Sequence, residues 1–350
     1  MKHQTTRYGE IPFYKIGTFG NTADAFISKK LFLEYKTKYS FPKKGDILIS
    51  ASGTIGRAVI YDGKPAYFQD SNIVWIDNDE TLVKNDFLFY AYSNIKWNTE
   101  HTTILRLYND NFKNTLIPLP PLNEQSAIAN ILSALDRYLC ALDALILKKE
   151  GVKKALSFEL LSQRKRLKGF NQAWQRVRLG DIAEIVKGQQ INKISLNNTD
   201  KYPVINGGID FLGYTNKFNV SKNTIAISEG GTCGFVRFMT SNFWSGGHNY
   251  SLQKISNKVN NLCLYHILKS YEKDIMKLVV GSGLKNIQLK ALKDFEIPLP
   301  PLNEQSAIAN ILSGLDHEII SLKNKKRQFE NIKKALNHDL MSAKIRVLEK

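Results

Sequence analysis

The sequence contains little cysteine and no paired cysteine motif. Its three cysteines, Cys140, Cys233 and Cys263, lie far apart and form no CxxC pair. Disulfide frameworks and zinc modules need cysteines at close, repeated spacing, so both are excluded and no metal site is expected. This usage predicts a protein of a reducing compartment, the cytoplasm.

A long hydrophobic run is also absent. The first ten residues, MKHQTTRYGE, contain no apolar core of a secretory leader. No stretch approaches the roughly 18 apolar residues that a membrane-spanning helix requires. We therefore expect a soluble, intracellular protein.

Motifs that carry catalysis are missing as well. The chain has no N/D-P-P-Y/F motif for amino-methyl transfer, no G-x-x-x-x-G-K-[ST] loop for nucleotide phosphates and no HExxH zinc motif. The nearest candidate, Gly281-Ser282-Gly283, is more typical of a turn. The sequence predicts no catalytic site and no cofactor bound by this chain itself.

The chain has fewer acidic than basic residues. Lysine plus arginine number 49 against 32 for aspartate plus glutamate, which gives a net charge of +17 at pH 7. Such a surplus favours a polyanionic partner, above all nucleic acid. A basic protein that is merely soluble is the alternative on charge alone.

What the chain does contain is a long internal repeat. Residues 117–136, IPLPPLNEQSAIANILSALD, recur as residues 297–316 with only Ala134 replaced, by Gly314. The offset of 180 continues without a gap, because Arg166 aligns with Arg346. A chain of 350 residues also exceeds the usual size of one core, so two domain-plus-helix units are expected.

Each repeat predicts a long helix. The prolines exclude helix upstream, Asn123 and Asn303 are expected to cap the helices, and Glu124 and Glu304 lie in their first turns. Downstream, apolar residues follow the alternating spacing of 4 and 3 that is typical of a coiled-coil seam, and a helix of 40 residues would extend ~60 Å. We expect an antiparallel coiled coil with pseudo-twofold symmetry, whose lysines mostly form a solubilising exposed face. The first seam consists of Ile128, Leu132, Leu135, Leu139, Leu142 and Ile146.

The segments before each helix are rich in short β-branched and aromatic runs, which favours an α+β fold with two mixed, β-rich domains. Their clearest shared feature is a strand that enters a glycine-rich turn, residues 49–56 and 227–234, followed by a basic residue, Arg57 or Arg237. Elsewhere they diverge, as expected of two reading domains with different specificities. The predicted organisation is a first domain over residues 1–116, a helix over 117–168, a second domain over 169–296 and a second helix over 297–350.

The LPPLNEQ motif leading twice into a long helix, each time after a domain with a GDILIS-ASGTIG type of strand and turn, resembles the specificity subunit of type I restriction-modification enzymes. The resemblance covers nearly the whole chain. It implies a non-catalytic adaptor with two target-recognition domains, each reading half of a split double-stranded DNA site, while the helices set the gap. It also implies assembly with two methyltransferase subunits, which bind S-adenosylmethionine, and with ATP-dependent restriction subunits.

One departure from that pattern concerns the first domain. The second domain opens with residues 174–188, an opening that resembles the family's usual start, and 29 positions separate Trp174 from Pro203. The matching Pro12 follows only 11 residues, so the first domain looks N-terminally shortened by one or two strands. Either a neighbouring chain completes it, or the chain is a shortened scaffold that binds methyltransferase through its coiled coil and has an impaired first reading domain.

DNA recognition needs cations that hold phosphates and amide or guanidinium groups that read base edges. Polar residues around the two glycine turns and in nearby loops fit these roles, although each one alone is more typical of a solvated loop. The candidates of the first domain are Lys43, Lys44, Ser52, Thr54, Arg57, Gln69 and Asn72. Those of the second are Lys187, Gln189, Gln190, Asn206, Asn216, Lys217, Arg237, His248, Asn249, Lys285 and Asn286.

Overall fold

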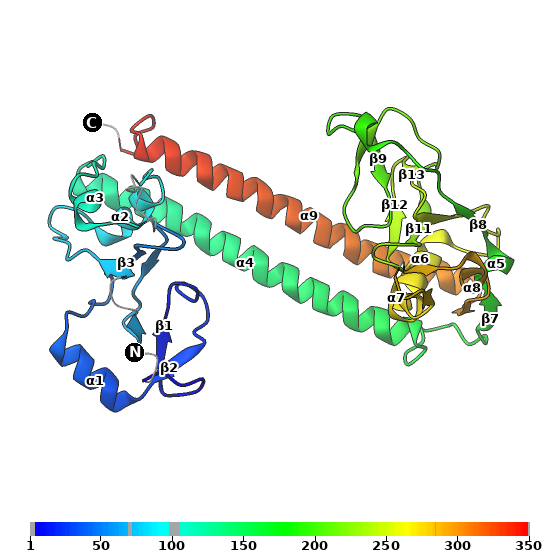
Figure 1. Ribbon diagram of the computed structural model, residues 1–350, viewed down its shortest axis with the longest axis horizontal. Coiled ribbons are helices and arrows are strands. Elements are labelled where there is room, and N and C mark those ends of the chain that lie inside the picture. The colour runs from blue at the N-terminus through cyan, green and yellow to red at the C-terminus, as the bar shows by residue number, and fades with distance from the viewer. Residues whose placement is uncertain (1–3, 69–71, 98–105, 284, 349–350) are drawn as a thin grey trace. The chain divides into compact units, whose positions relative to one another are not determined.

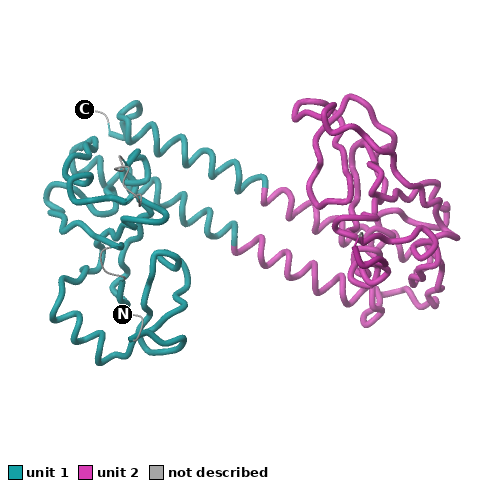
Figure 2. Tube along the Cα trace, in the orientation of Figure 1, with its two compact units in different colours: residues 1–143, 324–350 teal, residues 144–323 magenta. Residues whose placement is uncertain are grey.

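The computed structural model describes residues 4–68, 72–97, 106–283 and 285–348 (Figure 1). It divides into two compact units (Figure 2). Unit 1 comprises residues 1–143 and 324–350, and unit 2 comprises residues 144–323. Two helices of 40 residues, α4 (Leu122–Leu161) and α9 (Leu302–Met341), each contribute one part to either unit. No helix within the described ranges is long and apolar enough to cross a membrane.

Both long helices begin directly after the proline run. The backbone N–H of Gln125 donates to the carbonyl of Pro121 at 2.9 Å, and Gln305 does the same to Pro301. The expectation that Asn123 caps the helix is therefore wrong: α4 starts at Leu122, and the Asn123 side chain accepts from its neighbour Glu124 inside the first turn. Pro121 and Pro301 already have the φ that a helix start requires, so these prolines, and not the asparagines, directly precede the first helical residue.

In each unit the two helices run antiparallel, and the predicted seam is buried between them. In unit 1, Ile128 and Leu132 of α4 share a core cluster with Leu340 of α9. In unit 2, Ile308 and Leu312 of α9 lie in the same core cluster as Leu161 of α4. A helix of this length is stable in water mainly through such burial. The prediction of two long helices with a coiled-coil seam is confirmed.

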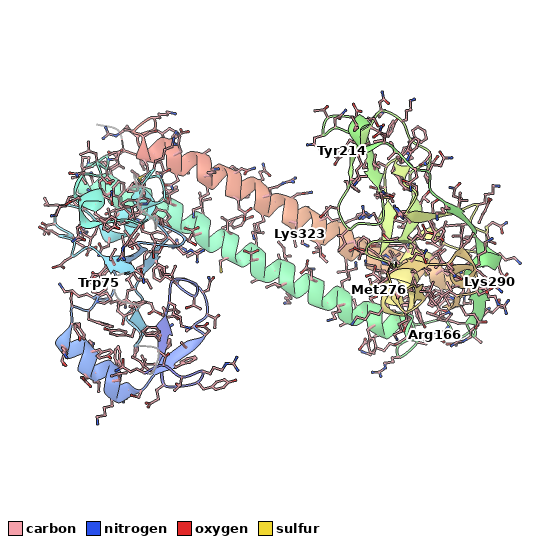
Figure 3. The ribbon with its side chains drawn as sticks, viewed as in Figure 1. Trp75, Arg166, Tyr214, Met276, Lys290 and Lys323 are labelled. Carbon is pink, nitrogen blue, oxygen red and sulfur yellow. The ribbon has the colours of Figure 1, made fainter. Side chains whose placement is uncertain are left out.

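The helix lysines are less exposed than expected. Lys149, Lys153 and Lys326 have only 26–30% of their side-chain surface exposed, and each forms an ion pair with an acid of the other helix. Interhelical pairs of this kind set the register of a coiled coil. The expected solubilising face is therefore wrong for these positions. The pairs are Lys149–Glu318, Lys153–Asp316 and Lys323–Glu150 in unit 2, and Lys326–Asp143 and Lys333–Asp136 in unit 1. Figure 3 labels Lys323 on α9.

Unit 1 contains two three-stranded sheets, with strand orders β2-β1-β5 and β4-β3-β6. Strand β1 is antiparallel to β2 and parallel to β5, whereas β3 is antiparallel to both neighbours. Its strands are β1 (Ile11–Tyr14), β2 (Ala25–Ile27), β3 (Ile47–Ser50), β4 (Ala58–Ile60), β5 (Tyr67–Phe68) and β6 (Ile73–Trp75). Its shorter helices are α1 (Lys29–Lys38), α2 (Asn85–Tyr92) and α3 (Asn109–Lys113).

Unit 2 repeats this plan and adds to it. Its sheets have the orders β10-β9-β13, β12-β11-β14-β8, β17-β7 and β15-β16. Its helices are α5 (Leu179–Ile182), η1 (Lys193–Ser195), α6 (Asn261–Ser270), α7 (Glu272–Met276) and α8 (Leu289–Lys293). Its strands are β7 (Gln175–Arg178), β8 (Glu184–Lys187), β9 (Tyr202–Ile205), β10 (Gly213–Thr215), β11 (Thr224–Ser228), β12 (Val236–Met239), β13 (Trp244–Ser245), β14 (Asn249–Gln253), β15 (Val279–Val280), β16 (Asn286–Ile287) and β17 (Glu296–Leu299).

The two units correspond in two of their sheets and in the helices α2 and α3, which match α6 and α8, whereas α1 between β2 and β3 has no counterpart between β10 and β11. Sheet β4-β3-β6 matches β12-β11-β14, and sheet β2-β1-β5 matches β10-β9-β13 with the same strand directions. Among its described residues, unit 1 has no counterpart of β7, α5 and β8. The prediction of an α+β fold with two β-rich domains and two long helices is confirmed.

Candidate nucleic-acid interface

The glycine-rich turn has the same backbone hydrogen bonds in both units. Ser50 N donates to Arg57 O at 3.0 Å and Gly56 N donates to Ser50 O at 2.9 Å. In unit 2, Ser228 N donates to Phe235 O at 3.0 Å and Gly234 N donates to Ser228 O at 2.8 Å. The turns are therefore equivalent, as their sequences predict, but Arg57 corresponds to Phe235. Arg237, the basic residue that follows the turn of unit 2, therefore stands two positions beyond the counterpart of Arg57.

These turns need glycine at two matched places. Gly53 and Gly231 have φ of 68° and 67°, and Gly56 and Gly234 have φ of 79° and 83°. Other residues adopt this left-handed region only at a cost in free energy. The shared glycines therefore allow the same backbone conformation in both turns, whereas the other side chains of the turns differ.

In unit 2 the turn lies among loops that are distant in sequence. Glu229 N donates to the carbonyl of His248 at 2.8 Å, and His248 N donates to Asn206 Oδ1 at 3.0 Å. Gln189 N donates to Ser245 O at 2.8 Å. The structure thus brings together the predicted residues Lys187, Gln189, Gln190, Asn206, His248 and Asn286, since Asn286 forms an isolated bridge with Gly230 beside them.

Glycines make this convergence possible. A Cβ atom on Gly207 would lie 2.6 Å from the carbonyl oxygen of Gly230, and a Cβ on Gly246 would lie 2.6 Å from Asn206 Oδ1. A Cβ on Gly188 would meet the carbonyl of Gly246. Close backbone approach of this kind excludes every larger residue. Sequence reasoning did not assign these glycines a role, although the paired glycines of residues 207–208, 230–231 and 246–247 were a visible signal.

A buried acid anchors the lysine of this cluster. Lys187 Nζ lies 2.6 Å from Glu229 Oε1, and Glu229 is 7% exposed while the lysine side chain is 55% exposed. The Tyr250 hydroxyl also donates to Glu229, at 3.2 Å, and burial together with that carboxylate raises the pKa of Tyr250 to about 12. Lys187 therefore neutralises Glu229, and this ion pair weakens the attraction of Lys187 for an external phosphate. Sequence reasoning missed both Glu229 and Tyr250.

Arg237 holds a loop in place. Its guanidinium lies over the rings of Phe211 and Phe235, 5.2 and 5.3 Å from their centroids, and Nη2 donates to the carbonyl of Ile209. Burial lowers the pKa of this guanidinium from its usual value. The stacked rings and Arg237 line a cavity of about 360 Å³. The guanidinium has five N–H donors, so this arrangement leaves others for a ligand.

The remaining predicted residues of unit 2 differ in exposure. Asn249 is 2% exposed in β14, where Ser228 Oγ donates to its Oδ1 at 3.4 Å, so it supports the sheet from inside. By contrast, seven candidates are exposed and offer amides, ammonium groups or an imidazole to a ligand. They are Gln189, Gln190, Asn216, Lys217, His248, Lys285 and Asn286.

In unit 1 the predicted residues form two groups. Ser52 Oγ donates to Asn72 Oδ1 at 3.0 Å beside the turn, and Thr54 is exposed at its tip. Arg57 Nη1 donates to the carbonyl of Phe19 at 3.0 Å, which ties the turn to the other sheet. Lys43 and Lys44 are exposed but precede β3, whereas the turn follows it, so the structure does not bring them together. Gln69 lies outside the described residues.

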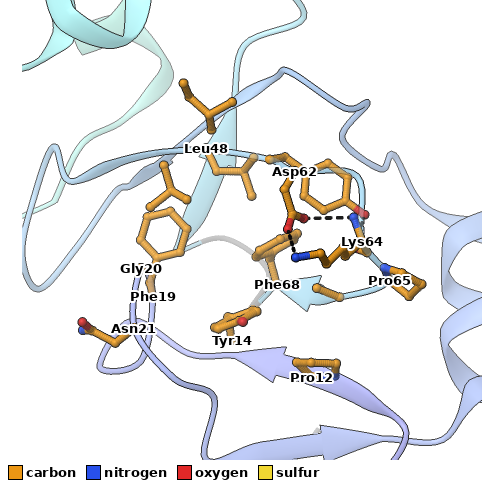
Figure 4. A pocket seen from close by; sticks show the side chains of 14 residues that line it. Pro12, Tyr14, Phe19, Gly20, Asn21, Leu48, Asp62, Lys64, Pro65 and Phe68 are labelled. Carbon is orange, nitrogen blue, oxygen red and sulfur yellow. Dashed lines mark hydrogen bonds and ion pairs between the residues drawn. The ribbon is translucent and has the colours of Figure 1, made fainter. Parts of the chain in front are cut away.

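Unit 1 also contains a cavity of about 410 Å³ between its two sheets (Figure 4). Tyr14, Phe19, Leu48 and Phe68 line it, and an ion pair of 3.1 Å between Lys64 and Asp62 lies at its border. None of the predicted DNA contacts among the described residues lines this cavity. Across the described ranges, no group of three His, Cys, Asp or Glu side chains is placed to hold a metal ion.

Known proteins share both the sequence pattern and the fold. A family model described as the type I restriction modification DNA specificity domain matches residues 1–149 and 171–331. The putative type I restriction enzyme MjaX specificity subunit of Methanocaldococcus jannaschii is 30% identical over 336 residues, which cover 87% of this chain and 79% of that protein. The putative specificity subunit S.HindORF215P of Haemophilus influenzae is 65% identical over 133 residues, 38% of this chain and 34% of that one.

Other alignments are also partial. With the relatives from H. influenzae, Mycoplasma pneumoniae and Mycoplasma genitalium, the chain spans 34–40% of their length. Among solved structures, the S subunit of a type I restriction-modification system from M. genitalium superposes with a TM-score of 0.72 and 22% identity, over 97% of this chain and 91% of that one. That similarity establishes a shared fold.

Proposed function

The chain belongs to the type I restriction-modification DNA specificity family, and on that basis we propose that it reads a bipartite DNA sequence and positions methyltransferase subunits on it. The predicted resemblance is confirmed. The chain is a specificity subunit, which recognises DNA for an enzyme complex and is not itself the catalyst. Flipping of the target base and methyl transfer then belong to the partner subunits.

One observation supports the proposal of two half-sites. The glycine-rich turns of the two units have the same backbone conformation but different side chains. Asn72 O and His248 O accept from equivalent N–H groups, of Ala51 and Glu229, so Asn72 corresponds to His248. The side chains at this position, an amide and an imidazole, offer different hydrogen-bonding patterns to a base edge. Two domains built in this way read two different sequences.

The proposed contacts comprise the exposed members of both clusters. In unit 2 these are five exposed residues around the converging loops, Gln189, Gln190, His248, Lys285 and Asn286, with Lys187 on a phosphate and Arg237 and Asn206 positioning the loops. Asn216 and Lys217 follow β10 at the end of that strand opposite to Asn206 and are proposed as a separate contact. In unit 1 they are the exposed Thr54 and the half-buried Asn72 beside the turn, while the buried Ser52 positions Asn72 through its hydrogen bond and Lys43 and Lys44 contact phosphate separately. We retain residues 1–116 and 169–296 as the two target-recognition domains and the intervening helices as the spacer. Because the proposed ligand is chromosomal DNA, we propose that the protein acts in the cytoplasm.

Two matched apolar sites on the helices support the docking of two methyltransferase subunits. Ile131 and Ile311 stand at equivalent repeat positions and are 38% and 37% exposed. Val152 and Ile332, also equivalent, are 39% and 43% exposed. Each unit therefore presents one residue of each pair, which is what two copies of one partner require. We extend the proposal to restriction subunits on the basis of family membership alone.

Exchange of one recognition domain tests the proposal. Residues 169–296 are replaced by the corresponding domain of another specificity subunit, and the hybrid is co-expressed with the methyltransferase. Sequencing that detects methylated bases should show that one half of the recognised sequence changes while the other half and the gap stay the same. An unchanged sequence, or a change in both halves, contradicts the proposal. Exchange of the first domain serves as the reciprocal control.

Among the residues that the structure describes, unit 1 differs from unit 2 in having no counterpart of β7, α5 and β8, and this difference favours a second candidate function. In that case the chain is a scaffold whose coiled coil binds methyltransferase while unit 1 does not read DNA. Co-expression with the methyltransferase distinguishes the two functions. An impaired first domain gives no modification or a symmetric recognition sequence, whereas two working domains give an asymmetric bipartite sequence.

A further inference from the structure

We propose that the loop between β9 and β10 of unit 2, residues 206–212, inserts the side chain of Ile209 between two base pairs of bound DNA. An apolar side chain that enters a base step unstacks it partly and kinks the duplex. The inference rests on the proposed function, because it assumes that unit 2 binds double-stranded DNA. It adds a contact of a different kind, since Ile209 donates and accepts no hydrogen bond through its side chain and responds to how easily a base step opens.

The loop presents apolar side chains to solvent. Ile209 is 57% exposed, Phe211 is 45% exposed and Leu212 is 36% exposed. Both ends of the loop continue into strands that pair with each other, β9 and β10, so the loop is the tip of a hairpin. Neighbouring apolar side chains that are exposed together mark an interaction surface, whereas a single one does not.

The corresponding loop of unit 1 packs its aromatic side chain inward. Residues 15–24 connect β1 to β2, as residues 206–212 connect β9 to β10. Phe19 of the unit 1 loop is 1% exposed and belongs to a core cluster with Leu48. The fold therefore does not require outward apolar side chains at the tip of this hairpin, and their presence in unit 2 favours a role in binding.

Arg237 fixes the conformation of the unit 2 loop. Its Nη2 donates to the carbonyl of Gly208 at 3.3 Å and to the carbonyl of Ile209. Its guanidinium lies 5.2 Å from the ring centroid of Phe211, and that ring meets the ring of Tyr214 edge-on at 6.0 Å. Figure 3 labels Tyr214 on β10. Because the loop is already held in this way, it loses little conformational entropy when Ile209 enters DNA.

The loop begins among the converging loops of the candidate nucleic-acid interface. Thr232 N of the glycine-rich turn donates to Gly207 O at 2.9 Å, and His248 N donates to Asn206 Oδ1 at 3.0 Å. Ile209 follows Gly207 by two residues, so their Cα atoms lie within about 7 Å of each other. The apolar side chain therefore reaches the same stretch of DNA that the polar residues of the cluster contact.

The charges near the loop favour DNA over an apolar protein surface as the occupant. Arg237 attracts Asp210, the acid of the loop, and Lys187 pairs with the buried Glu229. Lys285 is exposed, adjoins Asn286 beside the glycine-rich turn and adds a positive charge. Apolar side chains surrounded by compensated acids and a surplus cation suit a duplex, because phosphates flank every base step.

Duplexes that carry 2-aminopurine at single positions test the insertion, because the fluorescence of this base rises when it loses its stacking. The full chain is co-purified with its methyltransferase, and the label is moved through the half-site that unit 2 reads. Fluorescence should rise severalfold on binding at one step, and Ile209→Ala should remove most of that rise. Ile320→Ala is the matched control, because this isoleucine of α9 is 55% exposed, and it should leave the rise intact.

Two further measurements separate insertion from a general defect. Base flipping by the methyltransferase raises the fluorescence at the methylated base, and that rise should be equal for the chain and both variants at saturation. DNA affinity, measured by fluorescence anisotropy, should fall at least about fivefold for Ile209→Ala, because an aliphatic contact is lost, and stay unchanged for Ile320→Ala. Ile209→Met keeps a long apolar side chain and should retain the rise.

The outcomes distinguish the insertion from the proposed function. A complex that binds its sequence without a rise that depends on Ile209 overturns the insertion and leaves the proposed function standing. Absence of sequence-dependent binding by the unchanged chain overturns both. Loss of methyltransferase from the Ile209→Ala complex, with the fluorescence of the remaining complex unchanged, makes the loop a protein contact and also overturns the insertion.

Discussion

Two exposed lysines of unit 2 provide a quantitative test of DNA contact. Lys217 follows β10 and Lys285 precedes β16, and both are exposed. If each neutralises one phosphate, binding at that contact varies with salt concentration to a power of about −0.9. Replacing either lysine by glutamine therefore weakens DNA binding about 15-fold at 50 mM salt and about 4-fold at 200 mM salt. The logarithmic salt slope becomes shallower by about 0.9 per lysine.

Fluorescence anisotropy with a labelled duplex that contains the recognised sequence measures both quantities. Lys258→Gln is the matched control, because Lys258 is equally cationic and exposed but lies beside α6 and is not one of the predicted DNA contacts. It should leave the slope nearly unchanged. A similar loss for all three variants would mean that net charge, and not these contacts, controls affinity. A loss for Lys217 and Lys285 variants that does not vary with salt would refute the assignment to phosphates.

Three further predictions concern stability and assembly. Leu312→Ala removes a side chain that is 0% exposed in the large core of unit 2. The free energy of unfolding, measured by denaturant titration, should fall by about 2–5 kcal/mol. Ile320→Ala, on the exposed face of α9, is the control and should have a small effect. Burial lowers the pKa of His266 to about 4, below the unfolded value; stability is therefore complete above about pH 6.5 and declines toward pH 4 by about 3 kcal/mol, and His266→Gln should remove that decline in urea titrations at several pH values. Ile311→Asp should weaken co-purification of the methyltransferase without changing the melting temperature; unaltered co-purification would exclude the helix site.

The helices show what a sequence repeat can predict. Ile128 and Leu132 were expected on the seam and are 1% and 0% exposed, and the aligned Arg166 and Arg346 pair with Glu304 and Glu124. The glycine turns were also alignable, since a left-handed φ restricts the residue type. Signals of this kind are local or periodic, so one sequence is enough to reveal them.

Other features depend on which distant segments meet. Nothing near Lys149 in sequence reveals Glu318 as its partner, because the pairing follows from the antiparallel arrangement within unit 2. Lys43 and the glycine turn are close in sequence, yet β3 separates them. The cluster of Lys187, Asn206 and His248 likewise arises only when the sheets form.

The LNEQ segment, which occurs in both repeats, has a role that sequence reasoning missed. Gln125 Oε1 accepts from Lys84 N at 2.8 Å, and its Nε2 donates to Leu82 O at 3.0 Å. Gln305 makes the matching contacts with Asn260 N and Lys258 O, at 2.7 and 3.1 Å. The glutamine thus fixes each recognition domain to its helix at the start of α2 or α6. Its identical position in both repeats was the available signal.

The most direct test of the central claim is to map methylated bases in DNA from cells that express this chain with its methyltransferase. The account predicts an asymmetric sequence in two parts separated by a gap of fixed length, and no such methylation when the chain is omitted. Methylation of the same sequence without the chain, or of one continuous sequence with it, would contradict the account.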